Sequence, residues 1–331
     1  MILHRMIPAL LATVVAGLLC ATTEAGAGAE RPRVIISTDI GGGDPDDHQS
    51  MVHYLVYADR FVTEGLISSP PRAGRVKDIF DCLDAYEQDF ANLRTWSADY
   101  PSPRALRAVA RQGAIDSQAG ATPDALSAGA KLLVERARLR DPRPLYVLVW
   151  GSITDVAQAV HAAPDIKPRL RVYSIGSWNT RNGVKERDYL FSNHPDLWWI
   201  ENDTTFRGMY MGGNQEGDLS NKTFPEQHVR GHGALGGLFM LKKADIKMGD
   251  SPSVLYLLDG DPDQPGTPHW GGAFIQPQPV ERQNYWHDNP AKDLVFNGKA
   301  GAVTVNQWRP EYLSDWQARM IRAQTSKSST P

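Results

Sequence analysis

Four aspartates crowd into one short loop, in the sequence VIISTDIGGGDPDDH at residues 34–48. They are Asp39, Asp44, Asp46 and Asp47, and no lysine or arginine lies between them. Carboxylate oxygens at this density suit Ca²⁺ or Mg²⁺ better than metals that prefer Cys or His ligands. Capping the helix that follows would use only one of the four acids. We therefore interpret the loop as a metal-binding or catalytic element.

The segments on either side indicate where this loop lies in the fold. The β-branched residues 34–36 predict a strand at 34–37, and the apolar spacing at 48–57 predicts a helix. Glycines at 41–43 allow the tight turn that brings several oxygens together. In open α/β sheets, ligands bind outside the carboxyl ends of strands, at junctions of this kind.

Strand-like and helix-like segments alternate along most of the chain. This order predicts an α/β protein with a mainly parallel, doubly wound sheet. The Pro-, Gly- and Trp-rich composition beyond residue 249 predicts long C-terminal loops within the same domain. Trp198 and Trp199 are predicted to lie in the core on a helix-like stretch. The other predicted strands are 61–68, 145–150, 171–175 and 206–211, and the other predicted helices are 76–91, 102–110, 122–140 and 153–161.

The N-terminus has the composition of a cleaved export signal. Residues 1–29 combine a basic start, an apolar stretch and a run of small residues. We predict a periplasmic or secreted protein without a membrane anchor, because no later segment approaches the roughly 20 apolar residues of a membrane span. The domain would comprise residues 30–331, with a disordered tail at 325–331. Cys82 would be the one cysteine left, so no intramolecular disulfide is expected.

The charges of the sequence argue against nucleic acids and dinucleotides as ligands. The formal net charge is −3, which gives no basic footprint for a nucleic acid. A dinucleotide-binding interpretation of Gly41, Gly42 and Gly43 fails as well, because the neighbouring acids would repel a pyrophosphate.

Four stretches of the chain form a recognisable series: the Asp-rich loop, GLISS at 65–69, LYVLVWGSITDVAQA at 145–159 and GDSP at 249–252. In this order they resemble the nucleoside hydrolase superfamily. The resemblance is closer to its exported branch of nucleoside hydrolase-like domains, first described within a cellulose-binding protein. The four stretches span most of the chain. The resemblance implies a single α/β domain with the superfamily's sheet.

The resemblance also implies roles for individual residues. Asp39 would bind Ca²⁺ and deprotonate a metal-bound water that attacks an anomeric carbon. Asp46 would bind a sugar hydroxyl. The remaining metal ligands would be the side chains of Asp47 and Asp250 and the backbone carbonyl of Trp150, with Asp44 as a further candidate in the loop.

Two positions and one missing motif depart from the superfamily's pattern. Ser37 stands where an acid is usual, and Gly249 stands where a histidine helps to protonate the leaving group. An Asn-Glu-Asn type motif is not recognisable at 178–196. These departures favour a glycoside other than an ordinary nucleoside, such as a plant- or polysaccharide-derived sugar.

Histidines and tryptophans of the second half supply the remaining candidates. His232 is predicted to be the general acid, because Gly231 and Gly233 would allow close approach to a ligand. The predicted substrate contacts are Trp178, Asn179, His269 and Trp270, since exposed Trp faces stack on sugar rings. The alternative for each histidine is ordinary hydrogen bonding.

Two functions from different classes remain open. The first is an exported, Ca²⁺-dependent hydrolase of N- or O-glycosides, and the full set of aspartates favours it. The second is a carbohydrate-binding protein that keeps the ion on the same scaffold without turnover. In both cases the partner is a small glycoside or oligosaccharide. Relatives often form dimers or tetramers, so the resemblance leaves a homo-oligomer open.

Overall fold

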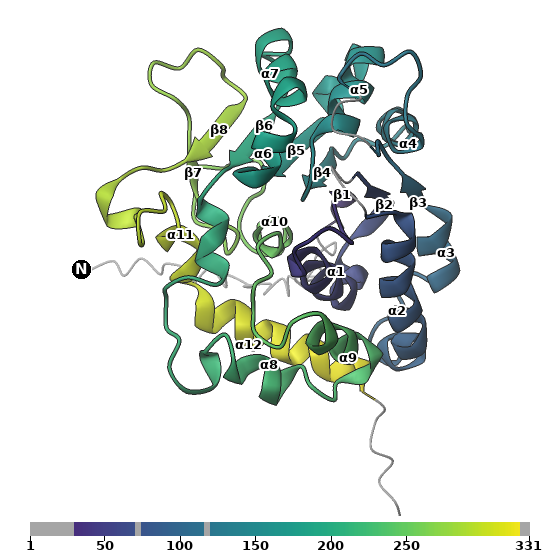
Figure 1. The fold of residues 1–331 in the computed structure, drawn as a ribbon, viewed down its shortest axis with the longest axis vertical. Helices are drawn as coiled ribbons and strands as arrows, with labels where there is room; N and C mark the ends of the chain where they lie inside the picture. Colours follow the sequence, from purple (N-terminus) through teal and green to yellow (C-terminus); the bar gives the residue numbers. More distant parts are fainter. Residues whose placement is uncertain (1–29, 70–73, 116–119, 325–331) are drawn as a thin grey trace, which may run out of the picture. The chain divides into compact units, whose positions relative to one another are not determined.

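Eight strands form one sheet in the order β3-β2-β1-β4-β5-β6-β8-β7 (Figure 1). The computed structural model describes residues 30–69, 74–115 and 120–324. Neighbouring strands run parallel, except that β7 is antiparallel to β8. The predicted α/β class with a mainly parallel sheet is therefore confirmed. The strands are β1 (Arg33–Thr38), β2 (Val62–Ser68), β3 (Ala110–Gln112), β4 (Leu145–Val149), β5 (Leu170–Ile175), β6 (Trp199–Asn202), β7 (Phe274–Ile275) and β8 (Tyr285–Asp288).

Helices cover both faces of this sheet (Figure 1). The α-helices are α1 (Asp46–Val56), α2 (Val76–Trp96), α3 (Pro103–Ala108), α4 (Ala128–Ala137), α5 (Thr154–Ala162), α6 (Trp178–Asn182), α7 (Val184–Asn193), α8 (Thr223–His228), α9 (Gly233–Lys242), α10 (Ser251–Leu255), α11 (Val303–Asn306) and α12 (Arg309–Met320). Short 3₁₀ helices lie at η1 (Ala58–Arg60), η3 (Pro164–Arg169), η4 (Thr205–Met209), η5 (Gly217–Leu219), η6 (Lys292–Leu294) and η7 (Ile321–Ala323).

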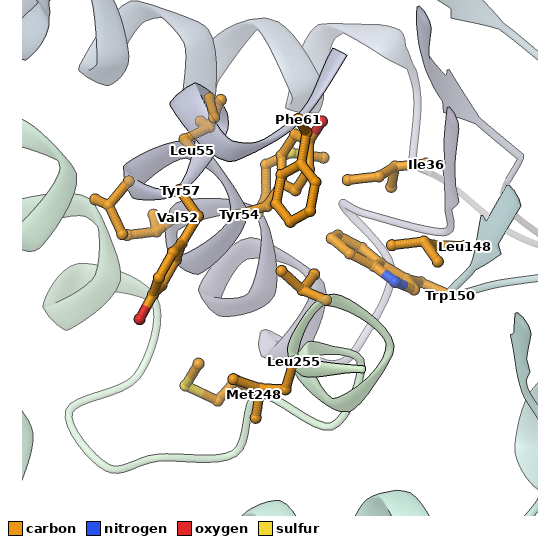
Figure 2. Close-up of a cluster of buried hydrophobic side chains, with 14 of the residues drawn as sticks. Ile36, Val52, Tyr54, Leu55, Tyr57, Phe61, Leu148, Trp150, Met248 and Leu255 are labelled. Atoms are coloured by element: carbon orange, nitrogen blue, oxygen red, sulfur yellow. The ribbon is translucent and has the colours of Figure 1, made fainter. Parts of the chain in front are cut away.

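Alternate side chains of β1 enter two separate hydrophobic cores. Val34 and Ile36 join the cluster that includes α1, α2, α9 and α12, whereas Ile35 joins the cluster of α4 and α5. Figure 2 shows the first cluster, in which the stacked rings of Tyr54 and Phe61 lie toward Ile36. The middle of a strand that is buried on both faces is apolar at successive positions, which explains the VII run at 34–36.

The strand order creates a topological switch point beside β1. The chain passes from β1 through β2 to β3 on one side, and β4, β5 and β6 follow on the other. Asp39 follows the last residue of β1, and Trp150 follows the last residue of β4. A Cβ on Gly151 would lie 2.7 Å from the Asp39 backbone nitrogen, so only glycine permits this approach. The Asp-rich loop therefore lies where open α/β sheets bind ligands.

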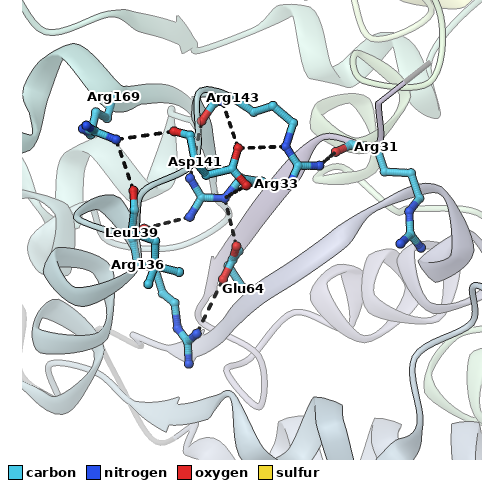
Figure 3. Close-up of polar contacts among 8 residues, drawn as sticks. All are labelled: Arg31, Arg33, Glu64, Arg136, Leu139, Asp141, Arg143 and Arg169. Atoms are coloured by element: carbon cyan, nitrogen blue, oxygen red, sulfur yellow. Dashed lines mark hydrogen bonds and ion pairs between the residues drawn. The ribbon is translucent and has the colours of Figure 1, made fainter. Parts of the chain in front are cut away.

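A buried ion-pair network anchors β1 at its opposite end (Figure 3). Arg33 is 1% exposed, and its Nε donates to Glu64 Oε1 at 2.9 Å. Its Nη2 donates to the backbone carbonyl of Arg136 at 2.8 Å, and Asp141 lies 3.7 Å from its Nε. These contacts hold the first residue of β1 against β2 and the connection that leads into β4.

Three of the predicted elements differ from the structure. The predicted strand 206–211 is wrong, because this region contains η4 and its first amides bind the Asp288 carboxylate. The helix predicted at 122–140 covers only α4, which begins after the Ser127 cap. The helix predicted at Trp198 and Trp199 is also wrong, since Trp199 begins β6, but both side chains are buried as predicted.

The C-terminal region carries the long loops that the composition predicts. Between α10 and α11, turns and coil surround β7, β8 and η6, and β8 extends the sheet beside β6. Within the described ranges no helix combines the length and apolar character that crossing a membrane requires. Cys82 is buried and forms no disulfide bond with any of the described residues. The predicted export signal at 1–29 and the predicted tail at 325–331 lie outside the described residues.

Candidate metal centre

A cavity of about 440 Å³ opens at the carboxyl ends of β1, β4, β5 and β6. Its wall is built from the Asp-rich loop, Trp150, residues 175–179, the turn that contains Phe206, Arg207 and Tyr210, and the segment from Lys247 to Asp250. Binding pockets for small molecules commonly have about 300 to 1,000 Å³. The cavity therefore has room for a small ligand at the switch point of the sheet.

Three carboxylates from distant parts of the sequence converge in this cavity. One oxygen each of Asp46, Asp47 and Asp250 lies within 4.8 Å of the others. Asp46 and Asp47 form the first turn of α1, and Asp250 immediately precedes α10. Asp39 interacts with Asp47 at the same place. The structure thus brings together four of the residues that the sequence analysis assigned to metal and sugar binding.

The chemistry of this cluster fits a hard divalent cation. Asp47 and Asp250 are 4% and 2% exposed, and Oδ2 of Asp250 has no hydrogen-bond partner among the described residues. A buried carboxylate oxygen without a partner is costly, and a bound cation would satisfy it. Oxygen is the donor atom throughout, which suits Ca²⁺ or Mg²⁺ rather than a softer metal.

Burial and mutual repulsion raise the pKa values of this cluster. Burial, with repulsion from Asp44 and Asp39, raises the pKa of Asp46 to about 7, although Lys247 opposes the shift. Burial also raises the pKa of Asp47 and of Asp250 well above the usual range, and the neighbouring carboxylates add to both shifts. Without a cation, the cluster therefore holds protons near neutral pH, and a divalent ion would displace them.

Calcium should stabilise the protein far more at pH 8 than at pH 5. The raised pKa values mean that the cation-free folded chain binds more protons than the unfolded chain from about pH 4 to pH 7, so its stability falls as pH rises through this window. At pH 8, calcium at 100 times its Kd should add about 2.7 kcal/mol to the free energy of unfolding. At pH 5, protons compete for the same oxygens and the gain should be small.

Thermal unfolding with calcium or with chelator at both pH values measures this effect. The variant Asp250→Asn tests whether the effect arises at this cluster. It removes one charged ligand and should therefore remove most of the calcium-dependent shift in the unfolding temperature. Equal shifts at pH 5 and pH 8, or none at either, would contradict the interpretation of the cluster as a cation site.

Trp150 and Asn179 meet at the cavity wall. The Trp150 carbonyl accepts a hydrogen bond of 2.8 Å from Asn179 Nδ2, and one lone pair of that carbonyl oxygen remains for a cation. Nε1 of Trp150 donates to Ser253 Oγ at 2.7 Å, and Ser253 Oγ donates to the Asp250 carbonyl at 2.7 Å. The indole thus links the end of β4 to the segment that carries Asp250.

Trp178 and Asp44 lie at the outer part of the cavity. Trp178 lines the cavity and is 49% exposed, which leaves part of its indole accessible to a sugar ring. Asp44 also lines the cavity, but it is exposed and forms an ion pair with Lys247. Asp44 is not one of the three converging carboxylates.

The structure does not bring His232 to the cavity. His232 precedes α9, and its Nδ1 lies 3.2 Å from the Arg230 carbonyl oxygen. The first amides of α9, Ala234 N and Leu235 N, donate to the Asp89 carboxylate of α2 at 2.8 Å. The glycines beside His232 therefore serve the turn into α9, which packs against α2, rather than the approach of a ligand.

His269 and Trp270 also lie away from the cavity wall. His269 is fully buried, with Nδ1 at 2.9 Å from the Asp259 carbonyl oxygen, and it stacks on Tyr256 with 4.2 Å between the ring centroids. Trp270 is partly buried and packs against the larger core. For His269 the alternative of ordinary hydrogen bonding describes the observed environment.

The residues of the cavity wall that the sequence analysis missed include Phe206, Arg207, Tyr210 and Lys247. A Cβ on Gly249 would lie 3.2 Å from the Phe206 ring and 3.4 Å from Asp46 Oδ2. The Phe206 ring therefore packs where a side chain at position 249 would begin. Recognising residues 199–202 as a strand would have placed the turn that follows at the carboxyl edge of the sheet.

Comparison with solved structures supports the same fold. A nucleoside hydrolase-related hypothetical protein from Saccharophagus degradans, associated with carbohydrate metabolism, has a TM-score of 0.73 and 25% sequence identity, over 90% of this chain and 73% of that chain. The effector protein XOO4466 has a TM-score of 0.55 and 12% sequence identity, over 90% of this chain and 95% of that chain. The plant nucleoside hydrolase PpNRh1 has a TM-score of 0.51 and 13% sequence identity, over 88% of this chain and 99% of that chain. The last two likenesses concern the fold alone.

No curated protein sequence matches this chain. A family model described as "Cellulose-binding Sde182, nucleoside hydrolase-like domain" matches residues 33–274, which include the whole Asp-rich loop, Trp150 and Asp250. Strands β1 to β6, the switch point and the converging carboxylates all lie within that match, whereas β8 lies beyond it. The chain belongs to the family of cellulose-binding Sde182, nucleoside hydrolase-like domains.

Proposed function

We propose that this protein is an exported, calcium-dependent hydrolase of N- or O-glycosides. The observation that carries the proposal is the meeting of Asp46, Asp47 and Asp250 within 4.8 Å at the switch point of the sheet, with Asp250 Oδ2 buried and without a partner among the described residues. A site that only bound sugar hydroxyls would not need so many buried carboxylates beside Asp39. Export rests on the composition of residues 1–29.

Each carboxylate has a distinct role in this proposal. Asp47, Asp250 and the Trp150 carbonyl would hold Ca²⁺, which would supply Lewis-acid activation of the attacking water. Asp39, next to Asp47, accepts the proton of that water. Asp46 binds a hydroxyl of the sugar. The negative charges around the sugar stabilise the positive charge that develops at the anomeric carbon during attack.

The rest of the cavity supports a small glycoside as the substrate. A volume of about 440 Å³ accommodates one or two sugar units. The half-exposed indole of Trp178 offers an apolar face on which a sugar ring can stack. Position 249, beside Asp250, is a glycine, and no histidine is among the described residues that line the cavity and could protonate a leaving group. Substrates whose leaving groups depart without a proton should therefore react fastest.

Hydrolysis of a panel of nitrophenyl glycosides and nucleosides tests the proposal. Nitrophenolate is a good leaving group, so the panel does not depend on a general acid. We expect turnover of at least one member, loss of that turnover with chelator, and recovery when calcium is added back. Turnover that is insensitive to chelator, or no turnover of any panel member, would contradict the proposal.

A carbohydrate-binding protein on the same scaffold is the second candidate. The absence of a histidine from the described wall of the cavity favours it, as does the word "cellulose-binding" in the description of the family. Calcium-dependent binding of glycans with no turnover of any panel member would identify this function.

A further inference from the structure

Arg207 lies in the wall of the same cavity as the carboxylate cluster. Its guanidinium stacks on the Phe206 ring, 4.5 Å from the ring centroid. Nη2 donates to Ser177 Oγ at 2.8 Å, and Nη1 donates to the Asp203 backbone carbonyl at 3.0 Å. A guanidinium has five N–H donors, so three remain for a ligand after these two bonds.

Both partners of Arg207 are uncharged groups. Within the described part of the chain, no carboxylate lies within ion-pair distance of its guanidinium. The other cation of the cavity wall, Lys247, pairs with Asp44. Arg187, on nearby α7, makes hydrogen bonds of 2.9 and 2.6 Å to Glu201. Arg207 therefore carries a positive charge into the cavity that the neighbouring protein groups do not neutralise at contact distance.

The turn that carries Arg207 is held firmly by buried groups. The Asp288 carboxylate accepts hydrogen bonds from the amides of residues 203, 204 and 205 at 3.1, 2.8 and 3.0 Å. Asn202 Oδ1 accepts from the Phe206 amide at 2.8 Å. These bonds fix η4 at the end of β6, so the guanidinium is oriented before any ligand arrives.

The partner of Arg207 on the neighbouring turn is conformationally unusual. Ser177 follows β5 with a φ of 61°, a left-handed conformation that is uncommon for residues other than glycine. Its amide donates to the Asp203 carboxylate. Strained backbone of this kind is concentrated at ligand sites. The turns after β5 and β6 thus jointly hold one guanidinium at the cavity.

We propose that Arg207 recognises an oxyanion carried by the substrate, so that the preferred glycosides are anionic. A guanidinium is the side chain best suited to bind carboxylate, sulfate or phosphate through two parallel hydrogen bonds. The carboxylate cluster with its cation binds the sugar hydroxyls, and Arg207 binds the anionic substituent in the same cavity. This inference rests on the proposed function in so far as the ligand is a glycoside.

Calorimetric binding to the full-length, calcium-loaded protein tests the inference with matched pairs of probes. The pairs are methyl β-D-glucuronide with methyl β-D-glucoside, glucose 6-sulfate with glucose, and ribose 5-phosphate with ribose. We expect the anionic member of at least one pair to bind about tenfold more tightly, because a charge-assisted bidentate contact is gained. The pair that shows the preference identifies the oxyanion.

Arg207→Gln should lower the affinity for the anionic probe to that of its neutral partner and leave neutral binding nearly unchanged. Arg207→Lys should retain part of the preference. Arg169→Gln is the matched control, since Arg169 also donates to backbone carbonyls, those of Leu139 and Asp141, and lies outside the cavity. This control removes the same charge and should preserve the preference of the wild type.

Equal binding within every pair, binding of no anionic probe, or a preference that survives Arg207→Gln would each overturn the inference. The measurement needs no turnover, so its outcome is separate from that of the hydrolysis panel. A protein that prefers anionic probes and hydrolyses nothing would refute the proposed hydrolase and support Arg207 as the anion-binding residue. A protein that hydrolyses neutral glycosides without any anion preference would support the proposed hydrolase and refute Arg207 as the anion-binding residue.

Discussion

Asp39→Asn is expected to lower the rate of glycoside hydrolysis by about 10²- to 10⁴-fold, the range in which general bases contribute. The carboxamide has nearly the same shape as the carboxylate but cannot accept the proton of the attacking water. Asp47 and Asp250 remain to bind calcium, so saturating calcium should not restore the rate. Single-turnover kinetics at saturating calcium, on the best substrate of the panel, measure the loss without interference from product release.

Asp81→Asn is the matched control for this substitution. Asp81 lies on α2, forms an ion pair with Lys77 at 2.8 Å and is outside the cavity wall. Asp81→Asn makes the same chemical change and the same change in net charge as Asp39→Asn. The hydrolysis rate of this variant should stay close to that of the wild type. If Asp39→Asn retained nearly full activity at saturating calcium, Asp39 would not be the base, and the assignment would pass to another group in the cavity.

The parts of the fold that could be predicted from the sequence are those in which local pattern and tertiary role agree. Residues 34–36 are continuously apolar because β1 is covered on both faces, and the same holds for the run in β4. The Asp-rich loop could be placed because it interrupts such a strand directly before an amphipathic helix. Both signals lie within a few residues of each other, and no distant partner is needed to interpret them.

The turn after β6 could not be predicted, because its structure depends on a residue far along the chain. The apolar run at 206–211 has the composition of a strand, but Asp288 of β8 binds the amides that open η4. A Cβ on Gly208 would also collide with the Ala302 carbonyl. Phe206 and Arg207 reach the cavity through these long-range contacts, so sequence reasoning missed them.

His232 and His269 were predicted to lie at the site, but the local sequence around them serves the fold instead. Glycines beside His232 have φ values of 75° and 70°, and they shape the turn that brings the start of α9 to Asp89. His269 is buried among backbone carbonyls and the Tyr256 ring. Glycine-rich surroundings indicate an unusual backbone, but they do not distinguish ligand access from a tight connection between helices.

The position of Asp39 depends on β1 as a whole, which is held at its other end by Arg33. Pairing with β2 and β4 fixes the register of β1 along its length. The side chain of Arg33 adds ionic contacts to Glu64 and Asp141 and hydrogen bonds to the carbonyls of Arg136 and Arg143. The carboxylate cluster and the ion-pair network therefore lie at opposite ends of one strand.

Arg33→Met should lower the free energy of unfolding by about 3 to 5 kcal/mol, the usual cost of removing one partner of a buried ion pair. Methionine fills much of the volume, but Glu64 loses its partner at 2.9 Å and two partly buried carbonyls lose their donors. Glu64 keeps Arg136 at 3.7 Å, which favours the lower end of this range. Denaturant unfolding in the presence of calcium measures the change.

Arg31→Met is the control, because it removes the same positive charge two residues before Arg33. Arg31 pairs with Asp99 at 3.5 Å, and their side chains are 37% and 63% exposed, so its removal should cost well under about 1 kcal/mol. Combining Arg33→Met with Glu64→Leu should recover part of the lost stability, because no buried carboxylate is then left without its partner. A small loss for Arg33→Met, equal to that of Arg31→Met, would show that the backbone pairing of β1 alone holds the strand that ends at Asp39.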